Sequence, residues 1–398
     1  MRCFMNYASG ASPRCPLIGE NNIRFANDWD GARLFKIYMY IYDESYFYTK
    51  ILKCSESEAQ DLTLLTESCY HRFSIPKKDG SRELCAVIKD SPLYKVQVNL
   101  KKYFSKLPVP EVAKGFAKGQ SYFDFLIPHL NKRYYLRLDI KDFFGSITRA
   151  HVLTGLKGFC SLDQCVELVG DLCTLDGTLP QGAVTSPALS NLVFARVDQR
   201  ILKYCQSLIT VYAGKELYLN DVVYTRYADD LLFSSNCLDF RKSKYFLRTV
   251  KKILSDNGFQ IHASKTKYGY DQIVLSGYVV GSDIHLSRKK MSELNRILYY
   301  FDAREQTDHS EYKVAVDKLK NEKELIKNII QLSDESQHGD AVKFTRVIDL
   351  VNYLCGYRAF LISVDKANFN KNSKILQNRK RIKKIEAVVD ALAAQYTL

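Results

Sequence analysis

The stretch YTRYADDLLFS, residues 224–234, places two adjacent carboxylates between two arms rich in β-branched and aromatic residues. Such arms favour extended strands, and Ala228-Asp229-Asp230 between them has the composition of a tight turn. The pattern predicts a hairpin over residues 221–235 whose turn presents both acids. Adjacent aspartates in an isolated turn are ordinarily solvated turn formers, so the rest of the chain must decide their role.

A third carboxylate lies near the end of another predicted strand. In RLDIKDFFGSI, residues 137–147, and the residues just before it, apolar side chains alternate with Arg137 and Asp139 as in a strand. If this strand and the 221–235 hairpin are neighbours in one sheet, the three aspartates converge. Carboxylate oxygens suit Mg²⁺, and two such ions activate an attacking hydroxyl and stabilise a leaving phosphate oxygen.

The composition favours an anionic partner. The 398 residues include 58 Lys and Arg against 44 Asp and Glu, a formal net charge of +14. The 27 Tyr and 21 Phe fit base stacking beside phosphate contacts, although a Tyr-rich core under a basic surface has the same composition. With 46% hydrophobic residues the chain is ordinary globular material of two or three domains, which excludes a disordered or collagen-like protein.

Cysteine usage and hydropathy predict a soluble cytoplasmic protein. The 11 cysteines are an odd number, none is spaced C-x-x-C, and we expect reduced thiols. The opening residues lack the apolar core of a secretory signal, and no uninterrupted apolar run of 18 residues exists. No membrane contact is expected.

Taken together, three motifs resemble those of reverse transcriptases, and their amino-acid sequences resemble those of the bacterial retron-type group. These are RLDIKDFFGSI, LPQGAVTSPALSN (residues 179–191) and YTRYADDLLFS, in the family's order and at about its spacing. The resemblance extends over residues 71–365. Val184 and Gly145 stand where retron enzymes usually have Pro, and Leu275-Ser276-Gly277 replaces their V-T-G triplet. These departures favour a divergent relative, such as the defence-associated reverse transcriptases. Further matching segments are IPKKDGSR (75–82), GFAKGQS (115–121), GFQIHASKTK (258–267) and GYRAFLISVD (356–365).

The resemblance implies an α+β fold: a right-hand polymerase with fingers, a ferredoxin-like palm and a helical thumb. Within it, the residues themselves predict a basic hairpin turning at residues 77–80, a helix over 93–107, a basic helix over 239–257 and short strands over 259–287. The expected domains are an N-terminal extension (1–70), fingers (71–133), a palm (134–284, with part of the fingers inserted at about 150–178), and a helical thumb with a basic C-terminal segment (285–398).

Carried across residue by residue, the resemblance makes Asp139, Asp229 and Asp230 the catalytic, metal-binding carboxylates. The Ile140 carbonyl is a further expected ligand. The implied cofactor is a pair of Mg²⁺ ions, with Mn²⁺ as a substitute. Lys265 matches a lysine that protonates the departing pyrophosphate, and the competing interpretation is a lysine that simply faces water.

The nucleotide site follows from the same resemblance. Phe144 matches a ring beneath the sugar of the incoming nucleotide, where it excludes a 2′-hydroxyl; a core Phe is the alternative. Lys78 and Arg82 match two basic residues that would hold the triphosphate, and a solvated hairpin is the alternative for them. The expected nucleotide-binding residues are Lys78, Arg82, Phe144, Gln181, Gly182 and Tyr227, the last of which begins the family's Y-x-D-D box.

The cationic end of the chain is expected to face nucleic-acid phosphates, unless it is a solvated helix face. The implied function is RNA-directed DNA polymerisation from a noncoding RNA template, with dNTPs as substrates and DNA as product, in anti-phage defence. An effector or accessory protein and an oligomer are compatible with the sequence. Alternatives are a group II intron maturase-like RNA-binding protein, a catalytically idle RNA scaffold, and ribonucleotide polymerisation. The candidate phosphate-binding residues are Lys371, Lys374, Arg379, Lys380, Arg381, Lys383 and Lys384.

Overall fold

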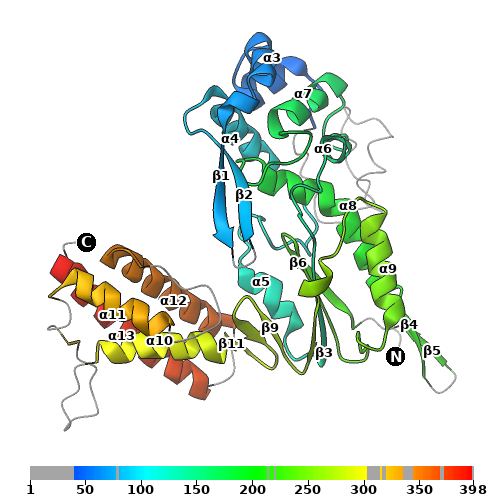
Figure 1. The fold of residues 1–398 in the computed structure, drawn as a ribbon. Helices are drawn as coiled ribbons and strands as arrows, with labels where there is room; N and C mark the ends of the chain where they lie inside the picture. Colours follow the sequence, from blue (N-terminus) through cyan, green and yellow to red (C-terminus); the bar gives the residue numbers. More distant parts are fainter. Residues whose placement is uncertain are drawn as a thin grey trace, which may run out of the picture.

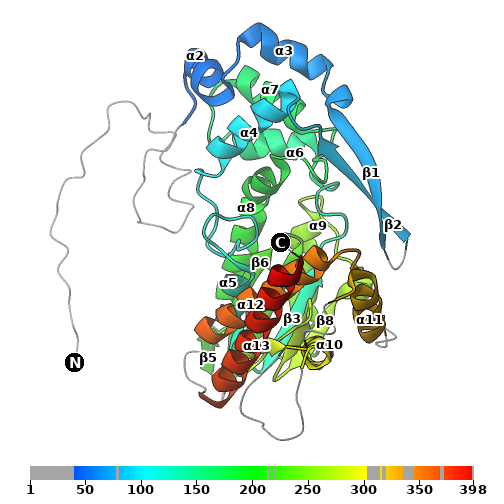
Figure 2. The same ribbon diagram turned by 90° about the vertical axis from the view of Figure 1, so that its left-hand side faces the viewer.

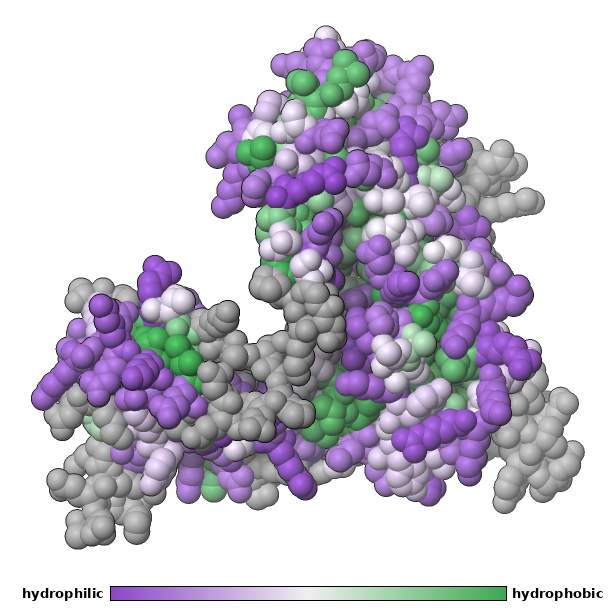
Figure 3. Space-filling view, in the orientation of Figure 1, coloured by the Kyte–Doolittle hydropathy of each residue, from purple (hydrophilic) through white to green (hydrophobic). Residues whose placement is uncertain are grey.

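The fold is an open L (Figures 1 and 2). One arm stacks helices above a central sheet, and the other is a helical bundle formed by the C-terminal part of the chain. Figure 3 shows the recess between the two arms in space-filling form. The computed structural model describes residues 40–77, 80–212, 215–218, 221–302, 314–315, 320–334, 344–367 and 372–396.

The palm is built on an antiparallel four-stranded sheet in the order β6-β7-β3-β8. Apart from two insertions described below, its elements follow one another as strand, helix, strand, strand, helix, strand. This is the βαββαβ topology of ferredoxin-like domains, so the predicted palm fold is confirmed. The elements are β3 (Tyr134–Asp139), α8 (Ser186–Gln206), β6 (Val223–Tyr227), β7 (Asp230–Ser235), α9 (Lys244–Ser255) and β8 (Lys267–Tyr270).

Strand alternation decides what each face of this sheet carries. Leu136 and Leu138 of β3 are fully buried on the face that α8 and α9 cover, as is Phe233 of β7, which packs on Phe246 of α9. The residues between them must point to the opposite face. That face therefore carries Arg137 and the carboxylate at the end of β3.

The fingers combine segments from both sides of β3 in sequence. The predicted basic hairpin is confirmed, because β1 and β2 pair antiparallel from Tyr70 opposite Val87 to Lys77 opposite Gly80. Although α6 and α7 follow β3 in the chain, they lie with α3 and α4 at the top of Figure 1. The elements are α2 (Glu44–Tyr46), the π-helix η1 (Phe47–Leu52), α3 (Glu56–Leu64), the 3-10 helix η2 (Glu67–Cys69), β1 (Tyr70–Lys77), β2 (Gly80–Val87), α4 (Pro92–Phe104), α6 (Arg149–Leu156) and α7 (Asp163–Cys173).

The segment expected to be an N-terminal extension divides near residue 40. Residues 1–39 lie outside the described residues. From Ile41 onward the chain is part of the fingers, because Phe47, Ile51 and Leu52 are buried in one core with α4 and α7. Burial of these apolar side chains ties the segment to the fingers rather than leaving it as a separate extension.

The thumb is a four-helix bundle with its own core, joined to the palm by a small three-stranded sheet. By length and composition alone, one helix of the described chain, Val347–Lys366, could cross a membrane. Its Leu350, Leu354 and Leu361 are buried inside the bundle. The elements are β9 (Ile273–Leu275), β10 (Tyr278–Val280), β11 (Ile284–Leu286), α10 (Arg288–Tyr300), α11 (Glu322–Asp334), α12 (Val347–Ala367) and α13 (Asn372–Tyr396).

The remaining elements include a β4–β5 hairpin that the sequence analysis did not predict and that projects from the palm in Figure 1. The predicted 93–107 and 239–257 helices are confirmed as α4 and α9, within a few residues at their ends. The nine cysteines in the described ranges are free thiols, as expected. These last elements are α5 (Tyr122–Leu126), η3 (Ile127–His129), η4 (Ala263–Lys265), β4 (Ile209–Tyr212) and β5 (Lys215–Tyr218).

Candidate active site

Two aspartates face each other at one end of the palm sheet. β3 and β7 pair so that Asp139 lies directly opposite Asp230. The Ile140 N–H donates to the Asp229 carbonyl at 2.9 Å, which ties the hairpin turn to the end of β3. The side chain of Asp139 is 5% exposed and that of Asp230 is 13% exposed. The structure thus brings together the two acidic motifs that are 90 residues apart in the chain.

Both of these carboxylates already have a cationic partner. Arg137 donates from Nε to Asp230 Oδ1 at 2.8 Å and lies 3.9 Å from Asp139 Oδ2. Lys265 donates from Nζ to the two Asp139 oxygens at 3.0 and 3.1 Å. Within the described ranges, no three His, Cys, Asp or Glu side chains are gathered closely enough to hold a metal ion. Arg137 and Lys265 neutralise the carboxylates in this arrangement.

The environment of the site destabilises the ionised forms of Asp229 and Asp230. Burial raises the pKa of Asp230 to about 6, although Arg137 opposes the shift. Burial also raises the pKa of Asp229, an effect reinforced by the charge of Asp139 and opposed by Lys265 and Arg82. Added positive charge would therefore stabilise the ionised forms of Asp229 and Asp230, and hard carboxylate oxygens are the donors that a divalent metal prefers. To hold such a metal, Asp139, Asp229 and Asp230 would have to draw closer together than they are beside Arg137 and Lys265, and the metal would neutralise charge on reacting phosphate oxygens.

A buried ion pair on the helix-covered side of the sheet supports the acidic turn. Arg226 of β6 is fully buried between the sheet and α8, and it donates to the two Asp198 carboxylate oxygens at distances down to 2.8 Å. The same guanidinium donates to the Ala228 carbonyl at 3.2 Å and to Asn191 Oδ1 at 3.1 Å. Ala228 has a φ of +55°, an unusual conformation for a non-glycine residue. This support was not predicted from the sequence, although a charged residue inside a buried strand signals it.

The loop that carries Gln181 and Gly182 docks on the fingers. The Cys85 N–H of β2 donates to the Gln181 carbonyl at 2.9 Å. Gly182 has a φ of +122°, and a Cβ added to it would lie 3.0 Å from the Cys85 carbonyl oxygen. Both the backbone conformation and this close approach favour glycine at position 182. The loop is therefore fixed to the hairpin that is predicted to hold the triphosphate.

Aromatic rings line the neighbourhood of the acidic turn. Phe144 is half-buried, and its ring centroid lies 5.4 Å from that of Phe143 and 6.1 Å from that of Phe116. Tyr227 makes an edge contact with Tyr122 at 5.0 Å. Phe116 and Tyr122 were not predicted from the sequence, although GFAKGQS, one of the segments that resemble the family, contains Phe116. Phe116 leaves 46% of its surface exposed, so it can meet a ligand.

The predicted triphosphate-binding residues lie on the β1–β2 hairpin. Lys78 lies outside the described residues. Arg82 is exposed on β2, and its charge lowers the pKa of Asp229, which places it within electrostatic reach of the carboxylates.

The predicted basic segment does not form a single exposed face. Arg379, Lys380 and Lys383 are exposed on α13. Arg381 instead turns toward α10 and donates to Asn295, and Lys384 Nζ lies 3.9 Å from Asp302, so these two cations face the bundle. Lys371 lies outside the described residues, as does the side chain of Lys374.

Comparison with known proteins agrees with this geometry. The family model for the reverse transcriptase (RNA-dependent DNA polymerase) matches residues 75–282. The chain is 32% identical over 251 residues to the retron Mx65 reverse transcriptase of Myxococcus xanthus, which covers 58% of this chain and 55% of that protein. It is 26% identical over 238 residues to the retron Ec86 reverse transcriptase of Escherichia coli, covering 58% and 69% respectively. The chain thus spans little more than half the length of the first of these relatives.

Solved structures that match include a telomerase from Candida albicans, with a TM-score of 0.41 at 12% identity over 83% of this chain and 66% of that chain. An apo telomerase from Candida tropicalis matches with a TM-score of 0.40 at 11% identity, over 82% and 62%. The family model covers just over half of the 398 residues, including both aspartate motifs and the Gln181 loop. The chain therefore belongs to the reverse transcriptase (RNA-dependent DNA polymerase) family.

Proposed function

We propose that this protein is an RNA-directed DNA polymerase that extends a priming hydroxyl by deoxynucleotide addition on an RNA template. The observation that carries the proposal is the pairing of Asp139 with Asp230, with Asp229 in the adjoining turn, in a chain of this family. These carboxylates would hold two Mg²⁺, for which Mn²⁺ would substitute. Catalysis of this kind is mostly positioning of the reactants and neutralisation of phosphate charge.

The remaining residues have roles that fit this chemistry. Arg82, together with Lys78, would bind the triphosphate from the hairpin to which the Gln181 loop is bound. Lys265, whose Nζ donates to Asp139 Oδ1 at 3.0 Å, lies beside the carboxylates and would protonate the departing pyrophosphate. Phe144 would exclude a 2′-hydroxyl, which favours deoxynucleotides over ribonucleotides.

We further propose that the template is a noncoding RNA and that the DNA product serves anti-phage defence in the cytoplasm. The relatives named as retron reverse transcriptases support this choice, together with the sequence resemblance to defence-associated enzymes. Sequencing nucleic acid that copurifies with the protein tests the template. Loss of phage resistance in cells carrying an inactive variant tests the biological role.

Labelled nucleotide incorporation tests the reaction itself. Purified protein with Mg²⁺, its copurifying RNA and dNTPs should make labelled DNA, whereas rNTPs should be poor substrates. Phe144→Ala should raise rNTP incorporation relative to dNTP incorporation at least tenfold, since about this discrimination follows from steric exclusion of one group. An unchanged ratio would remove Phe144 from the sugar site. Support of intron splicing without any incorporation would indicate a maturase-like protein instead.

A further inference from the structure

A short segment between α4 and α5 pairs with the outer edge of the palm sheet. It runs parallel to β6, with Ala113 bridged to Arg226. The Arg226 N–H donates to the Val112 carbonyl at 2.8 Å, and the Lys114 N–H donates to the Arg226 carbonyl at 2.8 Å. Because β6 ends at the acidic turn, a segment that runs parallel to it is carried toward the carboxylates.

Gly115 lets this segment pack directly on the acidic turn. It is buried, and a Cβ added to it would lie 2.6 Å from the Ala228 nitrogen and 3.1 Å from the Tyr227 carbonyl carbon. Backbone atoms cannot move aside as the end of a side chain can, so the close approach requires glycine. Asn191 of α8 holds the same residue, because its Nδ2 donates to the Gly115 carbonyl at 2.8 Å. The segment and the turn are therefore fixed to each other.

The next residue, Phe116, has an unusual backbone conformation. Its φ is +60°, in the region that favours glycine, yet the residue is a Phe whose surface is 46% exposed. Neither the backbone conformation nor burial in a core accounts for a large ring at this position. Strained positions of this kind cluster at functional sites.

The ring of Phe116 packs against that of Phe144, the residue expected beneath the sugar. Their ring centroids are 6.1 Å apart, and the two planes are inclined at 46°. A second ring neighbour of Phe144 is the buried Phe143, at 5.4 Å. Phe144 thus has one ring neighbour in the palm core and another on the segment that is fixed to the acidic turn. Without the Phe116 ring, the half-buried Phe144 would lose one of these contacts and could turn to another rotamer.

We propose that Phe116 is a positioning residue for sugar discrimination: its ring holds Phe144 where that ring excludes a 2′-hydroxyl. This role rests on the sugar-excluding role proposed above for Phe144. Gly115 sets the position of Phe116 relative to the carboxylates, because it packs against Ala228. A ribonucleotide would fit once Phe144 can turn away, although Phe144 itself is unchanged. If Phe116 only covered the palm core, its loss would lower stability and leave sugar selectivity as it was.

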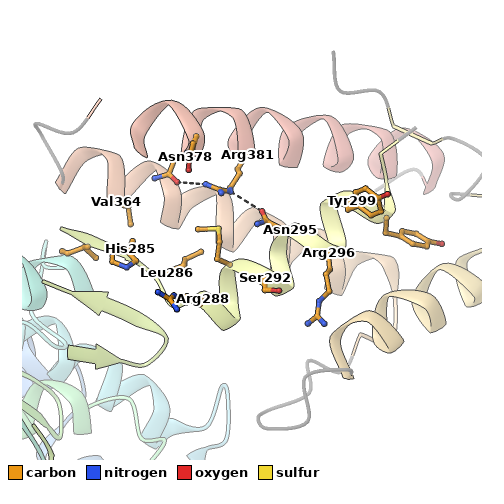
Figure 4. A pocket seen from close by; sticks show the side chains of 14 residues that line it. His285, Leu286, Arg288, Ser292, Asn295, Arg296, Tyr299, Val364, Asn378 and Arg381 are labelled. Carbon is orange, nitrogen blue, oxygen red and sulfur yellow. Dashed lines mark hydrogen bonds between the residues drawn. The ribbon is translucent and has the colours of Figure 1, made fainter. Parts of the chain in front are cut away.

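Sugar selectivity is measured as the ratio of kcat/KM for a dNTP to kcat/KM for the matching rNTP, with the full chain, Mg²⁺ and its copurifying RNA. Phe116→Ala should lower this ratio about fivefold, and Phe116→Tyr, which keeps the ring, should leave it within about twofold of the wild-type value. Tyr299→Ala is the matched control and should not change the ratio. It removes a ring that is 80% exposed on α10, beside the groove between α10 and α13 in the thumb (Figure 4).

Two further variants separate the ring from the backbone. Phe116→Gly also removes the ring but suits a φ of +60°, so its Tm should exceed that of Phe116→Ala while its ratio is equally low. Phe116→Ala combined with Phe144→Ala should match Phe144→Ala alone, because Phe116 acts through Phe144. A wild-type ratio in Phe116→Ala would overturn the proposal, as would single effects that multiply in the double variant. A restored ratio in Phe116→Gly would also overturn it, since backbone strain would then be the cause.

Failure of the proposed function gives a different result from failure of this role. If the wild type incorporates no dNTP, or if Phe144→Ala keeps the wild-type ratio, then Phe144 does not exclude the 2′-hydroxyl and Phe116 has no such role either. If Phe144→Ala lowers the ratio but Phe116→Ala does not, only the role of Phe116 is wrong.

Discussion

The guanidinium of Arg137 lies between the two paired carboxylates, with Nε 2.8 Å from Asp230 Oδ1 and Nη2 3.9 Å from Asp139 Oδ2. It reaches both because Arg137 precedes Asp139 by two residues on β3, and alternate residues of a strand share a face. The protein therefore carries its own counter-ion at the position where a divalent cation is expected to bind. Arg137 stabilises the metal-free site, and we expect it to compete with metal for Asp230.

Arg137→Gln should separate these two effects. Without the guanidinium, the partly buried Asp230 loses its partner, and the metal-free protein should lose about 3 kcal/mol of unfolding free energy. Mg²⁺ should then raise Tm more in the variant than in the wild type, measured as the difference between scans in Mg²⁺ and in EDTA. Arg133→Gln, which removes an exposed arginine that contacts Tyr270, is the control. An equal Mg²⁺ effect in all three proteins would show that Arg137 does not compete with metal.

The buried Arg226–Asp198 pair should hold the acidic turn in place as well as stabilise the fold. Asp198→Asn leaves the Arg226 charge buried without a carboxylate, and unfolding free energy should fall by about 3 to 5 kcal/mol. The double variant Arg226→Met with Asp198→Leu removes both charges and should recover most of that loss. It still lacks the hydrogen bond to the Ala228 carbonyl, so its nucleotide incorporation should stay low at normal Tm. Full activity in the stable double variant would show that the pair serves folding only.

Gly182→Ala should detach the Gln181 loop from the fingers. Gly182 and Gly119 both have positive φ, but only at Gly182 would a Cβ meet a backbone carbonyl. Gly119→Ala should cost about 1 kcal/mol for the backbone conformation alone, and Gly182→Ala about 1 kcal/mol more. Urea unfolding of the two variants measures the difference. Equal costs would mean that the contact with Cys85 is easily relieved.

A buried histidine should make palm stability depend on pH. His129 is fully buried, with Nδ1 2.7 Å from Ser234 Oγ and Nε2 2.8 Å from Thr225 Oγ1. Because the Thr225 hydroxyl donates to the Phe125 carbonyl, Thr225 accepts from Nε2, and in the neutral ring Nδ1 accepts from the Ser234 hydroxyl. Burial lowers the pKa of His129 from 6.5 to about 3.

The direction of this pH dependence follows from how many protons the folded and unfolded states bind. Below pH 6.5 His129 takes up a proton in the unfolded chain but stays neutral in the folded protein. Its contribution to the free energy of unfolding is therefore complete above pH 6.5 and is lost as the pH falls toward 3. The slope from this residue is about 1.4 kcal/mol per pH unit. His129→Gln should be less stable at pH 8, because it loses the two hydrogen bonds, yet its stability should fall less steeply between pH 6.5 and 4.5. Parallel curves for the two proteins would contradict this.

The sequence was sufficient for the features set by local pattern. Alternation in RLDIKDFF and the turn composition of Ala228-Asp229-Asp230 placed Asp139 at a strand end and the other two acids in a hairpin turn, and the structure pairs the two strands. The Lys77–Gly80 turn likewise predicted the fingers hairpin. In each case the information lies within about ten residues, where strand period and turn chemistry dominate.

The features that the sequence did not yield depend on contacts between distant segments. Arg226 meets Asp198 only because α8 packs on the helix-facing side of the sheet. Arg381 looked like one more exposed cation of α13, but helix packing turns it toward Asn295. Phe47 belongs to the fingers core because α4 and α7 lie beside it. No local pattern encodes these partners, since tertiary packing selects them.

The central claim is that Asp139, Asp229 and Asp230 carry polymerisation. Asp229→Ala is the cleanest test, because Asp229 has no ion pair with a described residue and burial already raises its pKa. The variant should therefore fold as well as the wild type. Substitutions of Asp230 or Asp139 would instead leave Arg137 or Lys265 without its carboxylate partner. Incorporation of labelled dNTP with Mg²⁺ and the copurifying RNA should fall at least a thousandfold at unchanged Tm, about 4 kcal/mol of transition-state stabilisation. Incorporation equal to that of the wild type would contradict the assignment of these carboxylates.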